Sequence, residues 1–418
     1  TKEFIADGIK VILKPSAKQI ISAQLFVRGG TANYSKKQEG IEAMAFTIAM
    51  DGGTTNKSKN DFTSEAEKLG TSFSKSTTLD YGNLSVTCIR SAWNASWNLF
   101  TDALLNPAFK AEEFEKERDK MLANIKQRES SADASLRELA MEHVFTGQNY
   151  AKKTEGSEAS LQTLKVEDVK QYFKSTICKS RCFLVIVGDV SEQDIRAKIK
   201  ASLAKLPQGR AATTEPRVLI TKSSEKIVDR KIATNYLLGV MSAPKFNSED
   251  GFPMLMAFNI LYDRFFVELR TKRSLSYAPQ ASYNRDALSN PFSVVYISTT
   301  KPKDAIDAMV AIIDSAKKYG ITKKELEDQK QSFLTSYFMK LETAEAQSNA
   351  LGRAEILGNW KLDDQFNKKV EATTLAQAND AIRKYTNAIM WTYLGKKEMV
   401  SASDFKQPIK YNASSKPY

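Results

Sequence analysis

The chain repeats itself once, and this repeat sets the size of the units into which it can fold. AFKAEEFEKERDKML at residues 108–122 matches GITKKELEDQKQSFL at residues 320–334, with a constant offset between the matched positions. Asp102 and Asp314 fall on the same offset. Solenoid repeats span only about 20–50 residues, so this period is far too long for a solenoid. The sequence therefore predicts two copies of a domain of about 200 residues.

A polar stretch marks the junction between the two copies. Pro207-Gln208-Gly209 and the residues that follow as far as Pro216 have the composition of a linker. We therefore expect an N-terminal domain at residues 1–206, a linker at 207–222 and a C-terminal domain at 223–418.

Hydrophobic patterning predicts both strands and helices in the first copy. Residues 9–13 and 20–28 are apolar and β-branched and are bounded by Pro15 and Gly29-Gly30, which favours two strands paired as a hairpin. The other predicted elements are helices at 40–54, 58–69, 91–105, 111–128, 133–145, 166–175 and 192–206, a strand pair at 71–78 and 83–90, and a buried strand at 182–190.

The second copy begins the same pattern again after the linker. IVDRKIATNYLLGVMSAP parallels the first hairpin, Glu249–Tyr262 parallels helix 40–54, and NPFSVVYISTT parallels the strand at 83–90. Antiparallel strands with segregated helices are typical of an α+β fold. We expect each domain to be an antiparallel-rich sheet with helices packed on one side.

Composition excludes several classes of protein. Hydrophobic residues make up 42% and charged residues 26% of the 418 residues, as in ordinary globular proteins, and no run of about 18 apolar residues could span a membrane. Because the numbering begins at Thr1, the lack of a targeting segment proves nothing about location. The net charge of +12 is spread along the chain without a nucleic-acid motif. A solvated basic surface or an acidic protein partner explains this charge, and no nucleic acid is expected.

Three cysteines, Cys88, Cys178 and Cys182, do not form a framework. Their number is odd and no C-x-x-C pair occurs, so neither a disulfide scaffold nor a zinc knuckle is predicted. Cys178 and Cys182 flank a turn, which leaves two alternatives: a local disulfide in an oxidising compartment, or two free thiols.

Helix 40–54, GIEAMAFTIAMDGGT, carries the clearest resemblance to a known family. A strand ending in Arg28-Gly29-Gly30, a polar loop and this helix resemble the first domain of M16 zinc peptidases, which include insulinase, pitrilysin and the mitochondrial processing peptidase. In that family the helix carries H-x-x-E-H, which binds zinc and activates water. Aligned on Gly40, those positions are Ala43, Phe46 and Thr47.

The resemblance also locates the third ligand of the family, a glutamate on a later helix. The position corresponding to that glutamate is Asn124, and Glu117, seven residues earlier, matches a supporting glutamate of active relatives. An amide is a poor substitute for a carboxylate on zinc. The chain has a single histidine, His143, which we expect at a surface or interface. We therefore expect no metal to be bound by this chain, and Glu117 to be a charge on a helix face.

The second copy keeps a different motif of the family. LRTKRSLSY resembles the L-R-x-K-x-x-L-x-Y segment of active members, in which an arginine and a tyrosine seven residues apart serve substrate and transition state. Arg270 and Tyr277 match those two residues. The structural alternatives are a salt bridge at a helix end for Arg270 and a half-buried strand position for Tyr277.

The resemblance therefore implies a non-catalytic subunit of a heterodimeric zinc peptidase. This chain would form half of a peptide chamber and supply Arg270 and Tyr277 to a partner that bears H-x-x-E-H and holds the zinc. AFNILYDRFF lacks the glycine-rich loop of mitochondrial recognition subunits, which favours a bacterial two-chain enzyme of the periplasm or cell envelope over the cytoplasm or mitochondrial matrix. The alternative function is an inert M16-like protein that holds peptides or has a structural role in the envelope.

Overall fold

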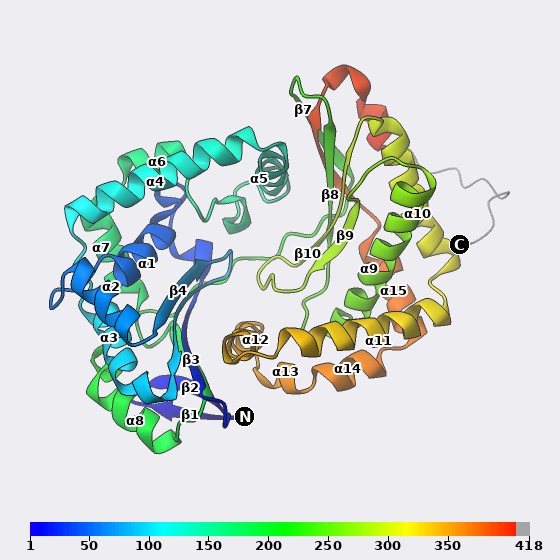
Figure 1. Cartoon of the computed structure of the whole chain (residues 1–418). Coiled ribbons are helices and arrows are strands. Elements are labelled where there is room, and N and C mark those ends of the chain that lie inside the picture. Colours follow the sequence, from blue (N-terminus) through cyan, green and yellow to red (C-terminus); the bar gives the residue numbers. More distant parts are fainter. Residues whose placement is uncertain (407–418) are drawn as a thin grey trace. The chain divides into compact units, whose positions relative to one another are not determined.

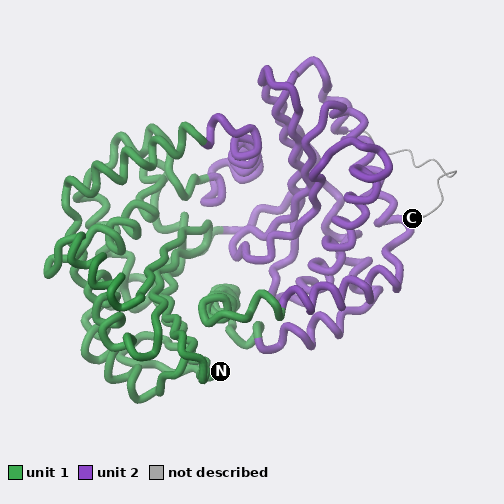
Figure 2. The backbone as a smooth tube through the Cα atoms, viewed as in Figure 1, with its two compact units in different colours: residues 1–127, 152–215, 338–363 green, residues 128–151, 216–337, 364–418 purple. Residues whose placement is uncertain are grey.

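The structure of the chain is a computed structural model that describes residues 1–406. These residues form two compact units, each built around one β-sheet (Figures 1 and 2). Unit 1 comprises residues 1–127, 152–215 and 338–363, and unit 2 comprises residues 128–151, 216–337 and 364–406 of the described chain.

Unit 1 contains a six-stranded sheet in the order β1-β2-β6-β3-β5-β4. Its strands are β1 (Lys2–Ala6), β2 (Ile9–Pro15), β3 (Ile20–Arg28), β4 (Ser72–Thr77), β5 (Tyr81–Ile89) and β6 (Cys182–Gly188). Its helices are α1 (Ile41–Asp51), α2 (Lys59–Lys68), α3 (Trp93–Leu105), α6 (Glu158–Thr163), α7 (Val166–Thr176), α8 (Glu192–Ala201) and α12 (Ala344–Ile356), with most of α4 (Ala111–Ser130) and of α13 (Lys361–Asp364).

The predicted pairing of strands 9–13 and 20–28 as a hairpin is wrong. β6 lies between β2 and β3, parallel to β2 and antiparallel to β3. All seven residues of β6 are buried, and a strand that is apolar on both faces is stable only in the interior of a sheet. The predicted antiparallel pair at 71–78 and 83–90 is confirmed as β4 and β5.

Unit 2 contains a five-stranded sheet in the order β7-β11-β8-β10-β9. Its strands are β7 (Ser224–Asp229), β8 (Asn235–Ser242), β9 (Gln280–Asn284), β10 (Phe292–Thr299) and β11 (Met390–Gly395). Its helices are α5 (Ala132–Val144), α9 (Gly251–Phe265), α10 (Pro302–Tyr319), α14 (Phe366–Ala372) and α15 (Leu375–Tyr385), with most of α11 (Lys323–Lys340). The hairpin expected here is also interrupted, because β11 lies between β7 and β8.

Both units have their main core on one face of the sheet. In unit 1, Val11, Leu25 and Leu84 belong to a cluster that also contains the buried residues of α1, α3 and α7. In unit 2, α9 packs against α10, α15 and β9. Because side chains of a strand alternate between faces, the other face of each sheet needs a cover of its own.

In each unit, the second face of the sheet is covered by a helix from the other sequence repeat. α5, from the first repeat, packs on β8 and β11 of unit 2, whereas α12, from the second repeat, packs on β3 and β6 of unit 1. The offset that matches residue 108 to residue 320 also matches Ala132, where α5 begins, to Ala344, where α12 begins. The linker at 207–222 thus separates the repeats in sequence, but each compact unit also contains one helix of the other repeat.

Candidate functional site

Helix α1 occupies the place where the sequence predicted a degenerate metal site. Its start at Gly40 adopts a left-handed conformation (φ 85°), and a Cβ there would lie 2.9 Å from the Gly156 Cα. The helix ends at Gly52-Gly53, and the predicted helix 40–54 is therefore confirmed. Its residues pack on both sides of the helix axis, as expected for a core helix.

The four residues at the predicted metal positions do not form a ligand set. Phe46 is fully buried and packs edge-to-face on Phe173, with ring centroids 6.3 Å apart. Ala43 and Thr47 are half-buried, and Asn124 is exposed on α4. A methyl group and a phenyl ring cannot coordinate zinc. Within residues 1–406, no cluster of three or more His, Cys, Asp or Glu side chains could hold a metal ion.

Carboxylate–lysine pairs surround the small hollow beside Thr47. This hollow, of about 210 Å³, is bordered by Thr47 and Asp51 of α1 and by Glu113 and Glu117 of α4. Glu113 accepts a hydrogen bond from Lys59 at 2.5 Å, and Asp51 pairs with Lys75. Lysine side chains therefore compensate the acidic charge that remains here. These lysines could not be predicted from the sequence, because nothing in their spacing connects them to α1.

Glu117 is more enclosed than a charge on a helix face. Its side chain is 17% exposed, and its nearest cation is Lys120, 3.8 Å away. Burial raises the pKa of Glu117, an effect that Lys120 partly offsets and Asp51 reinforces. The residue borders the hollow, and within residues 1–406 no metal ligand set accompanies it.

Arg270 and Tyr277 are in contact in unit 2. The guanidinium carbon of Arg270 is 4.2 Å from the centroid of the Tyr277 ring and 4.7 Å from that of Phe266. The guanidinium thus lies over two aromatic rings, and cation–π attraction to both restricts its motion. The structure brings together the two residues that the sequence singled out.

Neither structural alternative for this pair agrees with the geometry. Among the described residues, Arg270 forms no ion pair or hydrogen bond, so it is not part of a salt bridge at a helix end. Tyr277 lies in the loop before β9, and its side chain is 80% exposed, so it is not a half-buried residue of a strand. Within residues 1–406, the donor groups of both side chains have no hydrogen-bond partner and can bind a ligand.

The local backbone presents this pair at the surface. α9 continues as a π-helical segment, Phe266–Lys272, in which Glu268 is buried and pairs with Lys272. Such wider turns occur frequently at functional sites. Ser274 then adopts a left-handed conformation (φ 50°), and the Leu275 amide donates a 2.7 Å hydrogen bond to the Leu269 carbonyl, which turns the chain back toward Tyr277.

The pair borders a shallow hollow of about 260 Å³. Phe266, the loop residues Ala278 and Pro279, and Gln280, Ala281 and Ser282 of β9 also line it. Sequence reasoning missed Phe266. A usable signal existed, because Phe266 is four residues before Arg270 and residues four apart share one face of a helix.

His143 and the cysteines have structural surroundings. His143 is half-buried on α5, where its ring nitrogens lie 3.4 Å from the hydroxyls of Thr392 and Ser224, and burial lowers its pKa. Cys88, Cys178 and Cys182 are buried free thiols, and burial raises the pKa of Cys182 to about 12. Such a thiol is a poor nucleophile near neutral pH. None of these residues forms a second candidate site.

No helix within residues 1–406 has both the length and the apolar surface needed to cross a lipid bilayer.

Comparison with known proteins agrees with this architecture. Residues 10–158 match the family described as insulinase (peptidase family M16), and residues 163–333 match the family described as peptidase M16 inactive domain. The non-peptidase homolog YmxG of Helicobacter pylori is 23% identical over 374 residues, which cover 87% of this chain and 85% of YmxG.

Two solved structures show the same fold. The peptidase M16 inactive domain from Pseudomonas fluorescens superposes with a TM-score of 0.88 and 17% identity, covering 95% of this chain and 98% of that one. The periplasmic protease PqqL from Escherichia coli gives a TM-score of 0.77 and 14% identity, covering 100% of this chain and 51% of PqqL.

Proposed function

Because the chain belongs to the M16 peptidase family but has, within residues 1–406, no group of side chains that could hold a metal ion, we propose that it is the non-catalytic subunit of a heterodimeric M16 zinc peptidase. In this proposal it forms half of the peptide chamber, and the zinc is held by a partner subunit that bears H-x-x-E-H. This chain binds no zinc itself. The name of the Helicobacter pylori relative, a non-peptidase homolog, is consistent with a non-catalytic role.

One observation carries the proposal: Arg270 and Tyr277 are ordered against each other without using their hydrogen-bond donors inside the described chain. An arginine held for structural reasons usually pairs with a carboxylate, because leaving its donors unused forgoes that stabilisation. Here the guanidinium contacts two aromatic rings instead. A pre-ordered fork of N–H donors loses little entropy when it binds a carbonyl.

These donors suit the chemistry of amide hydrolysis. The guanidinium of Arg270 donates to the carbonyl oxygen of a bound peptide and carries a fixed positive charge, and the Tyr277 hydroxyl adds a neutral donor. Both interactions strengthen as the carbonyl oxygen becomes an oxyanion. In the partner's active site the pair would therefore stabilise the transition state more than the bound substrate.

The test is to purify this chain together with its H-x-x-E-H partner and to compare Arg270→Ala and Tyr277→Phe with the wild type. Loss of one oxyanion donor lowers turnover about 10²- to 10³-fold. Arg383→Ala and Tyr319→Phe serve as controls, because they delete the same groups elsewhere in unit 2. Thermal midpoints and the amount of complex recovered must match across the series.

If both assembled variants keep wild-type turnover, the proposed role in the partner's active site is wrong. The chain would then be an inert M16-like protein that holds peptides or has a structural role in the envelope.

We further propose that the chain acts in the bacterial periplasm or cell envelope. PqqL, which shares its fold over the full length of this chain, is a periplasmic protease. Fractionation of cells that express the natural gene tests the location, and recovery of the protein from the cytoplasm alone would contradict it.

A further inference from the structure

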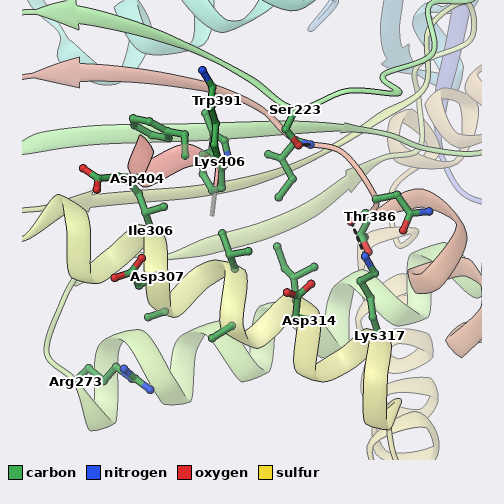
Figure 3. Close-up of a pocket in the computed structure, with 17 residues that line it drawn as sticks. Ser223, Arg273, Ile306, Asp307, Asp314, Lys317, Thr386, Trp391, Asp404 and Lys406 are labelled. Carbon is green, nitrogen blue, oxygen red and sulfur yellow. Dashed lines mark hydrogen bonds between the residues drawn. The ribbon is translucent and has the colours of Figure 1, made fainter. Parts of the chain in front are cut away.

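Unit 2 contains a second, larger hollow that has no part in the proposed function. It has a volume of about 830 Å³ and lies along α10 (Figure 3). Its apolar lining comes from Ile306 and Val310 of α10, from Ile389, from Trp391 of β11 and from Phe405. Asp307 and Asp314 project from α10 at its border (Figure 3).

The repeat shows what covers the corresponding surface in unit 1. Under the offset that relates the repeats, four residues of α10 that line the hollow match four residues of α3. In order, Val310, Ile313, Asp314 and Lys317 of α10 correspond to Asn98, Thr101, Asp102 and Leu105 of α3. In unit 1, those α3 residues face helix α8, and the space left between the two helices is smaller, about 450 Å³.

α8 is anchored to α3 by polar contacts as well as by apolar ones. Asp194 of α8 accepts a 3.0 Å hydrogen bond from the Trp93 indole, and Lys198 donates a 2.6 Å hydrogen bond to Asn94. Ile195 and Ile199, four residues apart, are fully buried beneath the helix. An amphipathic helix that contacts α3 through one carboxylate and one lysine therefore covers this face in unit 1.

The described part of unit 2 has no counterpart of α8. α8 begins four residues after β6 ends at Gly188. After β11 ends at Gly395, the described chain forms only two short turns, Lys397–Met399 and Ala402–Phe405, before Lys406. Within residues 1–406, the face of α10 that corresponds to the covered face of α3 is contacted by the short Ala402–Phe405 turn and is not covered by a helix.

The charges that line the hollow indicate the chemistry of a ligand. Each lining cation already has a partner: Lys406 lies 3.0 Å from Glu225, Lys317 3.5 Å from the Thr386 carbonyl, and Arg273 3.8 Å from Glu268. The lining carboxylate of Asp404 lies 3.4 Å from Lys303.

Asp307 and Asp314, in contrast, form no hydrogen bond or ion pair with any described residue. Burial raises the pKa of both carboxyl groups, and the nearby cations, Lys303 for Asp307 and Lys317 for Asp314, offset only part of that rise. They are seven residues apart on α10, which is about 10 Å along a helix.

We propose that this hollow is a docking groove for an amphipathic, basic helix of another protein, which covers α10 in unit 2 as α8 covers α3 in unit 1. The helix presents apolar residues four apart to Val310 and Trp391 and cations to Asp307 and Asp314. The sequence after Lys406, QPIKYNASSKPY, contains two prolines and no pair of large apolar residues three or four apart, so it lacks the pattern of α8.

A peptide derived from α8 provides the probe. The probe comprises residues 190–203 with the substitutions Ser191→Lys, Glu192→Ala and Asp194→Ala. These substitutions keep Ile195 and Ile199 and place lysines at positions 191 and 198, with the seven-residue spacing of Asp307 and Asp314. Binding of the labelled peptide to the full chain is measured by fluorescence anisotropy. We expect saturable binding that weakens at least tenfold in the double variant Asp307→Asn/Asp314→Asn.

Asp304→Asn is the matched control, because Asp304 is exposed on α10 but does not line the hollow. It should bind the peptide as the wild type does. Equal affinity of the double variant and the wild type, or no saturable binding to the wild type, would overturn the proposal.

Two further measurements distinguish other occupants. A chain truncated after Lys406 that binds the peptide tenfold more tightly would show that the chain's own C-terminal residues fill the groove. A dimer of the wild type that dissociates in the double variant, seen by light scattering, would show that a second copy fills it. Either result would replace the proposed partner helix.

Discussion

The side chains of Gln24 and Ser348 are joined by a 2.8 Å hydrogen bond, although 324 residues separate them in the sequence. The same Ser348 hydroxyl lies 3.0 Å from the hydroxyl of Ser22. Gln24 in turn accepts a hydrogen bond from Asn83. This buried polar network fixes α12 on the face of the unit 1 sheet that the main core does not use. Buried groups of this kind are costly unless each is satisfied, so the contact specifies one position of the helix.

Gly352 is the residue of α12 that should tolerate substitution least. A Cβ at this position would lie 2.0 Å from the Phe26 ring, so the helix could not keep its present distance from β3. Gly352→Val should therefore lower the free energy of unfolding by about 2–4 kcal/mol. Urea unfolding followed by circular dichroism measures the effect. Asn349→Val, at an exposed position of the same helix, is the control, and equal losses in both variants would contradict the packing argument.

The buried carboxyl group of Glu42 should make stability depend on pH. Its pKa is raised from an ordinary value of 4.5 to about 7, chiefly by burial, and the hydrogen bond from Tyr172 offsets part of that rise. The folded state therefore binds a proton more tightly than the unfolded state does. The resulting stabilisation is fully present below pH 4.5 and is lost as the pH rises through about 7, by at most about 3 kcal/mol.

Glu42→Gln isolates this contribution, because the amide does not titrate. The difference in unfolding free energy between wild type and variant should change across pH 4.5–7 in the direction that destabilises the wild type at higher pH. Parallel pH profiles of the two proteins would show that Glu42 does not titrate in this range.

The isolated chain should bind no stoichiometric zinc. In addition, a glutamate introduced into α1 at position 46, where the family has its general base, should destabilise the fold. Phe46→Glu places a carboxylate without a partner in a fully buried position against Phe173, which should cost more than about 3 kcal/mol. Phe46→Leu, which keeps the site apolar, should cost about half as much. Metal analysis after equilibration with zinc, together with thermal unfolding, checks both statements. One tightly held zinc per chain would refute the first.

The geometry of the guanidinium, and not only its charge, should matter in Arg270. Arg270→Lys keeps the charge but loses the planar fork and its stacking between Phe266 and Tyr277. In the assembled peptidase we expect kcat to fall at least tenfold. Phe266→Leu, which removes one of the two stacking rings but no donor, should produce a smaller fall. If the lysine variant retains full kcat, charge alone accounts for the role of this residue.

The sequence predicted the local elements well because their signals are local. The apolar spacing in GIEAMAFTIAMDGGT and its glycine ends are sufficient to locate α1. The pairing of strands was a different matter. β2 and β3 are neighbours in the chain and alternate as a hairpin would, yet the fully apolar β6, which begins only at Cys182, lies between them. Nothing in the two short strands encodes that insertion.

Part of the candidate site could also be predicted from the sequence, because part of its signal is local. The seven-residue spacing of Arg270 and Tyr277 is written in the sequence, whereas their stacking depends on the π-helical turn at Phe266–Lys272 and on the left-handed Ser274. The helical pattern at residues 133–145 predicted α5, whereas no helix was predicted at the position of α12. The periodicity of α5 contains no information about which sheet the helix covers.

The exchange of α5 and α12 bears on the ancestry of the chain. A single repeat expressed alone would lack the helix that covers one face of its sheet, and it would carry an unsupported helix of its own. Two such copies could complete each other by trading that helix, as in a domain-swapped homodimer. Fusion of the two genes would then have given the present chain, in which cleavage of the peptide between the repeats would not separate the halves.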